Sequence, residues 1–393
     1  MMLLGIVAFV AALLISVCLH EAGHFFTARH YGMKASRFFV GFGPTLWSRK
    51  RGETEYGVKA IPAGGFVKIE GMTPLEEIDP ADVPRAFYNK PARARLVVMS
   101  AGSIVHFIIA IVLIYGVLLT LGTPKVSENK IGATSCVATT AECSGSGPAA
   151  AAGMRPGDRV ISFDGVPITK WQQFTQLVRE HGAGQATVVV DRDGERVTLT
   201  PTLVEVLRDR ATGGEGKDPV GAIGVKPGID SERYGPIAAI PRTGDVIWTG
   251  VTGMYETLTH RLDDLGNLFS DNRDPAGFVS VVGAARIGGD VVAAPDSSWP
   301  DRIRDFLVLV AAINLAVGIF NLLPLLPLDG GHIAVLAFEQ ARHGLRRLRG
   351  YRGPVQRVDF AKLLPATYAT VIVLLGFSLL ILSADIVNPI RLQ

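Results

Sequence analysis

Two histidines and a glutamate near the amino terminus form the pattern with the clearest chemistry in this chain. His20, Glu21 and His24 occupy the fixed positions of an H-E-x-x-H motif. Residues four apart share one face of a helix, so the two imidazoles can bind a single Zn²⁺ ion. Glu21 then lies beside the metal, where a carboxylate can act as general base toward water. The motif therefore predicts zinc-dependent hydrolysis.

The motif follows an apolar run, residues 3–19, that contains no charged side chain. Ionisable groups in a membrane span are costly, and they usually mark function. A pair of purely structural histidines at a helix end is the alternative. No Lys or Arg precedes the run and no small-residue cleavage site follows it, so we expect a retained span rather than a signal peptide.

The composition is that of a membrane protein. Hydrophobic residues make up 48% of the chain and charged residues 19%, and the mean hydropathy is positive. A bilayer core of about 30 Å needs roughly 20 apolar residues in a helix. Four segments meet this requirement, and the predicted spans are residues 3–26, 96–121, 306–328 and 364–382.

Charge is distributed unevenly along the chain. Residues 29–95 contain 12 Lys and Arg against 7 Asp and Glu, and residues 339–362 contain 7 against 2. Residues 124–304 contain 19 against 23. Because basic loops stay in the cytoplasm, we expect the two short loops inside the plasma (cell inner) membrane, and the long segment and both termini outside. The net charge of +3 sums opposite parts, so nucleic-acid binding gains no support.

The three cysteines fit this topology. Cys18 lies in the first span, where a thiol acts as a small packing residue. Cys136 and Cys143 both fall in the external segment, in a polar stretch rich in Gly, Ser and Thr. An oxidising exterior permits a disulfide between them, and the sequence predicts one.

The external segment begins with a small domain. Short β-like runs at residues 159–163, 186–190 and 196–200 alternate with turns, and residues 171–180 read as an amphipathic helix. The stretch 150–165, AAAGMRPGDRVISFDG, resembles a PDZ domain. Such domains bind an extended peptide at a sheet edge, and one that has lost binding and only blocks access is the alternative.

The rest of the external segment is less regular. Residues 204–232 contain ATGGEGKDP and are expected to form a flexible surface excursion. Apolar residues recur every three or four positions across residues 234–269, which predicts one or two amphipathic helices. Residues 275–289 are too short to span a bilayer and are expected to be re-entrant or interfacial.

The third span supplies a candidate for the missing ligand. A catalytic zinc needs three protein ligands and one open position. Asp329 ends this span and is the first carboxylate after Asp305; buried and unpaired it would be costly, and a cation removes that cost. Pro324 and Pro327 break backbone hydrogen bonds near the same depth. His332 competes for the role, but it lies outside the apolar run.

The chain as a whole resembles the site-2 protease family of intramembrane zinc metalloproteases. The resemblance rests on H-E-x-x-H in the first span, on N-x-x-P and L-D-G later in the chain, and on the inserted PDZ-like segment. V-G-F-G-P at residues 40–44 and A-G-G-F-V-K at residues 63–68 extend the resemblance over nearly the whole chain. It is nearest to the actinobacterial regulators of sigma-factor signalling that carry a single PDZ domain.

The resemblance implies roles for individual residues. His20, His24 and Asp329 would bind one Zn²⁺ per chain, and Glu21 would be the catalytic base. The remaining residues would bind substrate, through the edge of a re-entrant β-hairpin and through the end of the third span: Gly64, Gly65, Phe66, Val67, Asn321, Pro324 and Pro327.

The resemblance also implies a fold and a function. We expect four transmembrane helices, a membrane-associated β-hairpin and an inserted α/β PDZ domain, divided as residues 1–123, 124–203 (PDZ), 204–305 (linker and amphipathic helices) and 306–393. The expected reaction, in regulated intramembrane proteolysis during stress responses, is cleavage of single-pass membrane proteins such as anti-sigma factors, after an upstream site-1 protease has made a first extracytoplasmic cut.

Two departures from the family pattern stand out. Enterobacterial relatives carry two PDZ domains, so a tandem exclusion filter cannot be assumed for one. The second span usually carries G-P-x-x-N, whereas residues 102–106 read G-S-I-V-H. We interpret His106 as a tolerated replacement for that asparagine, with a new polar contact near the site as the alternative, and we do not count it as a metal ligand.

Two functions of other classes remain open from the sequence. A metal transporter would share buried His and Asp, but it predicts several midplane charges and repeat symmetry, and neither is visible. A catalytically silent membrane scaffold presenting the PDZ domain predicts loss of Glu21 or of a ligand, and all of these are present.

Overall fold

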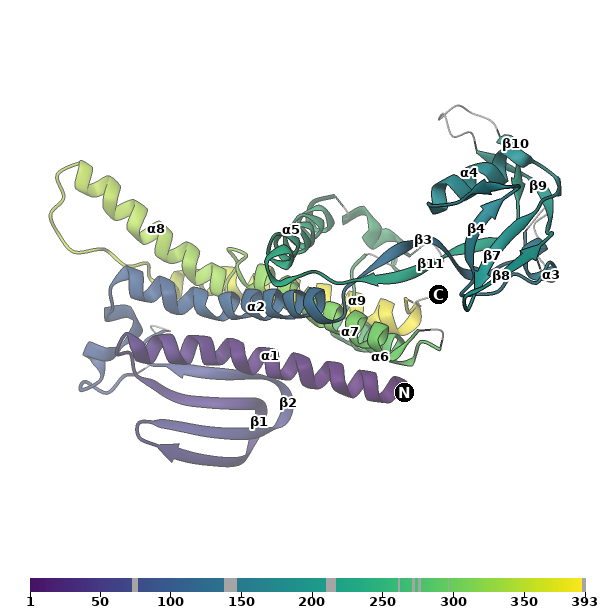
Figure 1. Ribbon diagram of the computed structural model, residues 1–393. Coiled ribbons are helices and arrows are strands. Elements are labelled where there is room, and N and C mark those ends of the chain that lie inside the picture. The colour runs from purple at the N-terminus through teal and green to yellow at the C-terminus, as the bar shows by residue number, and fades with distance from the viewer. Residues whose placement is uncertain are drawn as a thin grey trace. The chain divides into compact units, whose positions relative to one another are not determined.

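The structure is a computed structural model of residues 1–393, and it describes residues 1–72, 77–137, 147–209, 217–260, 262–270, 273–274, 277–295 and 297–390. Two compact units are present (Figure 1). Unit 1 combines Met1–Leu121 with Tyr234–Gln393, and unit 2 is Gly122–Arg233. Unit 2 is thus inserted between two parts of unit 1.

Unit 1 is mainly helical. Its helices are α1 (Met2–His30), α2 (Ala92–Thr120), α5 (Pro236–His260), α6 (Val281–Ala293), α7 (Trp299–Asn321), α8 (Asp329–Leu348) and α9 (Leu364–Val387). Short 3₁₀ turns occupy Val83–Arg85, Phe87–Asn89, Leu262–Asn267 and Phe360–Leu363. Among the described residues, four helices are long and apolar enough to cross a membrane: Met2–His30, Ala92–Thr120, Trp299–Asn321 and Ala361–Val387. The predicted number of spans is confirmed.

Three apolar clusters hold unit 1 together. One joins α1 and α2 to the end of the β-hairpin and includes Met33, Ile69 and Val98. A second joins α2, α5 and α7. The third seats Phe9 of α1 against α6 and α7. These contacts place α1 and α2 side by side (Figure 1), with α7 against α2.

Residues 275–289 were expected to be re-entrant or interfacial. That placement stays a prediction. Within the segment α6 begins at Val281 and packs against α1 through small residues. A Cβ added to Gly5 would lie 2.5 Å from the carbonyl oxygen of Gly288. Such close backbone approach is typical of membrane helix pairs, where small residues allow van der Waals contact. The glycines in the sequence, and not the length of the segment, indicate that α6 packs closely on α1.

The third predicted span is shorter than expected. Residues 306–328 were predicted to form it, but α7 ends at Asn321 and a new helix, α8, begins at Asp329. Pro324 and Pro327 fall between the two helices. Proline lacks the N–H that would continue a helix, and it disfavours helical geometry in the residue before it. Asp329 is therefore the first residue of α8, where a carboxylate complements the positive end of the helix dipole.

A β-hairpin follows α1, where one was expected. β1 (Ala35–Arg51) and β2 (Thr54–Ile69) are antiparallel, and the hairpin folds back on itself. Phe38 of β1 pairs with Val67 on one side and with Tyr56 on the other. Glycines with φ values rare in other residues allow the bends, Gly41 at +89° and Gly64 at +132°. The last segment of β2 thereby reaches α1.

Unit 2 is an α/β domain. Its strands are β3 (Thr123–Thr134), β4 (Arg159–Phe163), β5 (Val166–Pro167), β6 (Gly184–Gln185), β7 (Val188–Arg192), β8 (Glu195–Leu199), β9 (Thr202–Asp209), β10 (Lys217–Ala222) and β11 (Val225–Glu232), and its helices are α3 (Pro148–Ala151) and α4 (Trp171–His181). One sheet has the order β11-β3-β4-β7-β8 with β5 beside β4, and a second has the order β10-β9-β6. The predicted strands and helix agree with β4, β7, β8 and α4 to within two residues.

The G-D pair of the PDZ-like stretch has a structural role in unit 2. Asp158 is buried and accepts a hydrogen bond from the backbone N–H of Arg155 at 2.8 Å. The Arg192 guanidinium donates to both of its carboxylate oxygens at 2.8 Å. Burial alone would raise the pKa of Asp158, but these hydrogen bonds hold that pKa below its usual value. The carboxylate thus ties the loop before β4 to β7.

Residues 204–209 and 217–232 do not form the flexible excursion that was expected of residues 204–232 from their composition. β9, β10 and β11 run through most of this segment, and β11 pairs with β3 from Val225–Thr134 to Glu232–Thr123. The compact unit therefore extends to Arg233, beyond the predicted domain end at 203. Composition misled because β9 pairs with β10, and β11 with β3, across intervening residues, and such pairing leaves no local compositional signal. Residues 210–216 lie outside the described part of the chain.

The cysteines agree in part with expectation. Cys18 is a free thiol in α1, and Cys136 is disulfide-bonded. The expected partner, Cys143, lies outside the described residues. The Cys136–Cys143 pairing stays a prediction.

Candidate metal centre

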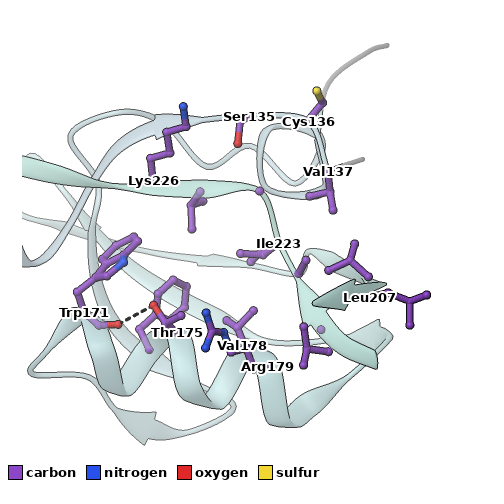
Figure 2. A pocket seen from close by; sticks show the side chains of 17 residues that line it. Ser135, Cys136, Val137, Trp171, Thr175, Val178, Arg179, Leu207, Ile223 and Lys226 are labelled. Atoms are coloured by element: carbon purple, nitrogen blue, oxygen red, sulfur yellow. Dashed lines mark hydrogen bonds between the residues drawn. The ribbon is translucent and has the colours of Figure 1, made fainter. Parts of the chain in front are cut away.

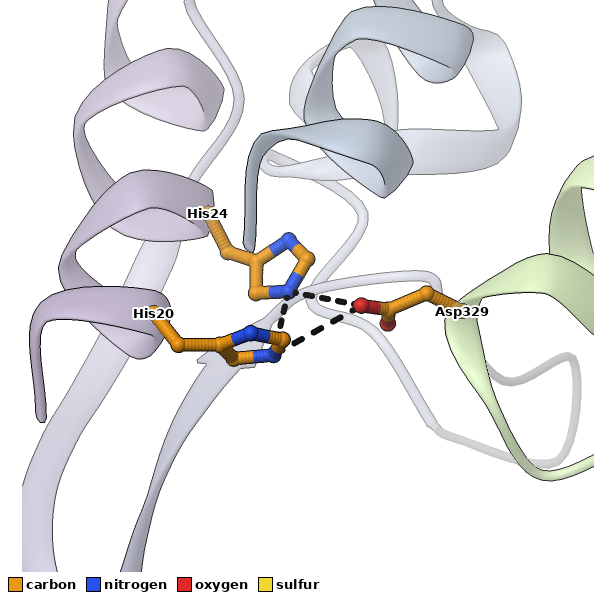
Figure 3. A group of neighbouring side chains, drawn as sticks. All are labelled: His20, His24 and Asp329. Atoms are coloured by element: carbon orange, nitrogen blue, oxygen red, sulfur yellow. Dashed lines mark hydrogen bonds and ion pairs between the residues drawn. The ribbon is translucent and has the colours of Figure 1, made fainter. Parts of the chain in front are cut away.

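Three side chains from distant parts of the sequence converge in unit 1 (Figure 3). His20 and His24 come from α1, and Asp329 comes from the start of α8. Asp329 Oδ2 lies 3.5 Å from His20 Nε2 and 3.2 Å from His24 Nε2. The two Nε2 atoms are 3.1 Å apart. Among the described residues these three form a group whose potential ligand atoms all lie within 4.8 Å of one another.

The spacing of these atoms fits a tetrahedral zinc site. Zinc binds nitrogen and oxygen at about 2.0–2.2 Å, so tetrahedral ligand atoms lie roughly 3.3–3.5 Å apart. The observed separations of 3.1, 3.2 and 3.5 Å are close to this value. Asp329 Oδ2 is buried and has no hydrogen-bond partner. Two imidazoles and one carboxylate also leave a fourth position for water, as catalytic zinc sites require.

The other nitrogen of His24 is fixed by the neighbouring helix. His24 Nδ1 lies 2.7 Å from the backbone carbonyl oxygen of Val98 in α2. An Nδ1–H donating there leaves the lone pair of Nε2 facing Asp329. Metal-binding histidines commonly use this second hydrogen bond to set their tautomer and orientation. The sequence gives no signal for this contact, because the acceptor is a backbone atom.

Two glycines allow α1 and α2 to approach at the site. A Cβ added to Gly23 of the H-E-x-x-H motif would lie 3.0 Å from the carbonyl oxygen of Ala101. A Cβ added to Gly102 would lie 2.4 Å from both His20 Cε1 and His24 Nε2. Any side chain at position 102 would therefore occupy the space of the two imidazoles.

Glu21 lies beside the group and contacts the hairpin. Its Oε2 accepts a hydrogen bond from the backbone N–H of Val67 at 2.9 Å. Gly65 also lies close to this side chain, since a Cβ added to it would be 3.5 Å from Glu21 Cγ. Of the predicted substrate-binding residues, the stretch from Gly64 to Val67 therefore runs past the candidate base.

The remaining predicted residues lie at the α7–α8 connection. Asn321 is the last residue of α7, and Pro324 and Pro327 lie in the turn that leads to Asp329. A Cβ on Gly330 would lie 2.2 Å from the Leu322 carbonyl oxygen. The glycines after Asp329 thus let the start of α8 pack directly on this turn, which holds the carboxylate in place.

His332, the competing ligand, is not part of the converging group. It lies in α8 and lines a cavity of about 280 Å³ together with Arg95, Met99 and Glu339. Burial lowers the pKa of His332 below its usual value.

His106 lies against His20 but does not join the three candidate ligands. Its ring centroid is 5.0 Å from that of His20. His106 Nδ1 lies 2.8 Å from Asn314 Oδ1, and Asn314 Nδ2 donates to the Val310 carbonyl. That donation makes Oδ1 the acceptor, so His106 Nδ1 carries the proton. Our sequence reasoning missed Asn314, although an amide inside an apolar span is a visible signal.

A second candidate site lies in unit 2. A groove of about 550 Å³ is lined by α4 on one side and by β9, β10 and the start of β11 on the other (Figure 2). Trp171, Thr175 and Val178 line it from the helix, and Lys226 lines it from β11 (Figure 2). β11 is an edge strand, paired with β3 on one side only, and its first two residues, Val225 and Lys226, line the groove.

Comparison with known proteins gives consistent results. The family model described as Peptidase family M50 matches residues 8–365. A protein named zinc metalloprotease Rip1 from Mycobacterium tuberculosis is 42% identical over 410 residues, covering 100% of this chain and 99% of the relative. Its Mycolicibacterium smegmatis counterpart is 38% identical, with 99% and 98% covered. Metalloprotease MmpA of Caulobacter vibrioides is 31% identical over 362 residues, with 86% and 87% covered.

Asp329→Ala tests the ligand set. We expect the variant to lose the stoichiometric zinc of the wild type, because two histidines cannot hold a catalytic zinc against solvent. Elemental analysis of purified protein measures this directly, and His332→Ala should keep its zinc as the matched control. If Asp329→Ala kept one zinc per chain and His332→Ala lost it, the third ligand would be His332 instead of Asp329.

Gly102→Ala tests the close approach of the two helices. The added Cβ would meet both imidazoles at 2.4 Å, so we expect loss of zinc although no ligand is changed. Gly116→Ala is the control, because a Cβ at that position on the same helix meets nothing within 4 Å. Chelator competition gives the zinc affinity, and circular dichroism checks that the helices persist. Equal affinities in the two variants would contradict the geometry.

Proposed function

This chain belongs to Peptidase family M50, the site-2 protease family, and is a zinc metalloprotease; from this premise we propose that it cleaves single-pass membrane proteins within or near the bilayer, with His20, His24 and Asp329 as zinc ligands. The convergence of these three side chains beside Glu21 is the observation that carries the proposal. The membrane-protein character rests on four helices of spanning length. The expectation of a zinc enzyme is confirmed, which removes the transporter and the silent scaffold.

Glu21 performs the proton transfers in this proposal. Zinc supplies Lewis acidity toward water and toward the scissile carbonyl when it is bound. The Glu21 carboxylate takes a proton from the attacking water and returns it to the leaving amine. The Val67 N–H holds one carboxylate oxygen at 2.9 Å and so orients the group toward the site.

The hairpin edge offers a way to bind the substrate. A transmembrane helix satisfies its own backbone groups, so the segment to be cut must unwind first. Adding that segment as a strand beside residues 64–67 gives its N–H and C=O groups new partners. The edge runs past Glu21, so a peptide bond in the added strand comes within reach of the base. Asn321 at the end of α7 is proposed to hold the substrate backbone from the other side.

The charge distribution supports a topology. The basic loops, residues 29–95 and 339–362, are proposed to be cytoplasmic and unit 2 extracytoplasmic. Unit 2 would then meet the part of a substrate that a first protease has trimmed. Anti-sigma factors are the proposed substrate class, on the basis of the sequence resemblance.

We propose that unit 2 is a PDZ domain that binds an extended peptide. The groove lined by α4 and by the start of the edge strand β11 favours binding over a purely steric role, because both an edge strand and a facing helix are available. The chain leaves and re-joins unit 1 at adjacent points, since the Tyr234 N–H donates to the Leu118 carbonyl at 3.0 Å. Unit 2 can therefore be removed without stretching unit 1.

Glu21→Gln tests the proteolytic function. The amide keeps the size of the side chain but cannot take a proton, so we expect zinc content to be unchanged and cleavage of a single-pass substrate to fall at least 100-fold. Elemental analysis and an assay in reconstituted membranes give the two readouts. Wild-type cleavage by this variant would remove Glu21 from the mechanism.

Val67→Pro tests the hairpin edge. Proline removes the N–H that holds Glu21, and the loss of one hydrogen bond to a charged group is worth about 1.5–3 kcal/mol. We expect cleavage to fall roughly 10- to 100-fold with zinc retained. Val67→Ala keeps the N–H and should cleave nearly as well as the wild type. Normal cleavage by the proline variant would exclude this edge from substrate presentation.

Replacing residues 122–233 by a short linker tests unit 2 as a filter. A filter that admits only trimmed substrates predicts that the deletion cleaves untrimmed substrate, which the wild type leaves intact. Immunoblotting of tagged substrate in cells that lack the first protease measures this. Continued dependence on trimming would contradict the filter.

A groove variant separates peptide binding from simple blocking. Thr175→Arg places a long side chain in the groove, whereas Gln172→Arg adds the same charge at an exposed position of the same helix. Peptide binding predicts altered cleavage of trimmed substrate for the first variant only. Identical behaviour of both variants would favour a steric plug.

A further inference from the structure

Helix α8 carries an apolar stripe that none of the described residues of unit 1 covers. Phe338, Leu345 and Leu348 are 56%, 61% and 86% exposed. With 100° between successive residues, they fall within an arc of about 100° together with Ala337 and Ala341. An exposed stripe of this width is the face that a helix normally buries.

The opposite face of α8 is the one that packs on the bundle. Leu336 and Glu339 are buried there. Glu339 accepts a hydrogen bond from Arg95 of α2 at 3.1 Å and another from the backbone N–H of Val358 at 2.9 Å. The helix is therefore anchored with its apolar stripe turned away from α2.

A row of arginines borders the stripe. Arg342, Arg346 and Arg349 lie along one side of it. Arg342 and Arg346 reach the neutral side chain of Gln356. Within the described part of the chain none of the three pairs with a carboxylate, and Glu339 is already held by Arg95. Arg346 also lies over the Tyr351 ring, 5.8 Å from its centroid. No described carboxylate neutralises these three side chains, so their charge can attract an external anionic partner.

The position of α8 limits what that partner can be. The helix starts at Asp329, against the last turns of α1, and Arg95 in the first turn of α2 holds its inner face. It therefore leaves the bundle at the end where two candidate spans meet the membrane surface. An apolar stripe edged by arginine at that level matches acyl chains and anionic headgroups.

We propose that α8 lies in the surface of the membrane leaflet at this end of the bundle, with its stripe on the acyl chains and Arg342, Arg346 and Arg349 on anionic lipid headgroups. The helix begins with Asp329, so contact with an anionic leaflet also steadies this carboxylate. That second statement rests on the proposed ligand role of Asp329, whereas the lipid contact does not.

The test places spin labels on single cysteines at Leu345, Leu348 and Arg347, in full-length Cys18→Ser protein with the remaining cysteine pair left oxidised. The protein is reconstituted in nanodiscs of phosphatidylcholine with or without 30% phosphatidylglycerol. Accessibility to oxygen, which enriches in lipid, and to a water-soluble nickel chelate is then measured by electron paramagnetic resonance. Position 347 lies outside the stripe and serves as the control position.

We expect labels at 345 and 348 to be accessible to oxygen and protected from nickel, and the label at 347 to show the reverse. Protection at 345 and 348 should increase at least three-fold with phosphatidylglycerol. Protection from both reagents would mean that a protein or a second copy covers the stripe, and accessibility to nickel in both lipids would mean that water does. Either result overturns the proposal.

A charge variant tests the arginines. Arg342→Gln/Arg346→Gln/Arg349→Gln should lose the response to phosphatidylglycerol. Arg49→Gln/Lys50→Gln/Arg51→Gln removes the same charge from the exposed hairpin and should keep it. An unchanged response in the α8 variant would overturn the role of the arginines.

Zinc affinity tests the link to Asp329. We expect it to be about 10-fold higher for the wild type in the anionic nanodiscs than in neutral ones, in the range that changes around metal ligands produce, and equal in the two lipids for the α8 variant. Equal wild-type affinities would overturn the link while leaving the lipid contact intact. Absence of zinc from the wild type in both lipids would instead count against the proposed ligand set.

Discussion

The meeting of two imidazoles and a carboxylate inside an apolar bundle is the contact on which the arrangement of unit 1 depends. A carboxylate alone in such surroundings would be costly, and the two imidazoles, with the zinc ion proposed between them, would offset that cost for Asp329. Bringing it to α1 requires α7 to stop at Asn321 and α8 to start in a new direction. The proline-containing turn and the glycines packed on it provide that change. The break between α7 and α8 therefore also brings the candidate ligand Asp329 to the two histidines.

The same constraint sets how closely α1 and α2 approach. The second nitrogen of His24 uses a backbone carbonyl of α2, so the imidazole can be oriented only if the two helices are in contact. Gly23 and Gly102 remove the side chains that would keep them apart. A membrane offers little hydrophobic driving force between helices, and close packing must supply the attraction instead. Gly23 and Gly102 therefore allow α1 and α2 to pack closely, and the same close packing orients the two imidazoles.

The local part of this arrangement could be predicted from the sequence, and so could one non-local contact, the meeting of Asp329 with the two histidines. Most of the other non-local contacts could not. Spacing on one helix predicts that His20 and His24 share a face, and hydropathy alone predicts the four spans. The hydrogen bond from His24 to Val98 involves a backbone acceptor 74 residues away, which no residue type reveals. β9 to β11 were missed because turn residues dominate the composition between strands whose pairing is long-range. The helix α8 was missed because an apolar run does not show where prolines redirect it.

The edge of the hairpin lies next to Glu21, so the proposed substrate-binding strand and the proposed base are in contact. An unpaired strand edge in apolar surroundings leaves N–H groups without partners, and each such group is costly. At Val67 the partner is the Glu21 carboxylate, so the edge and the candidate base form one polar cluster. An extended peptide that pairs with this edge must arrive alongside Glu21, because the two are already in hydrogen-bond contact. Substrate alignment and access to the base would then follow from the same strand geometry, without a separate positioning element.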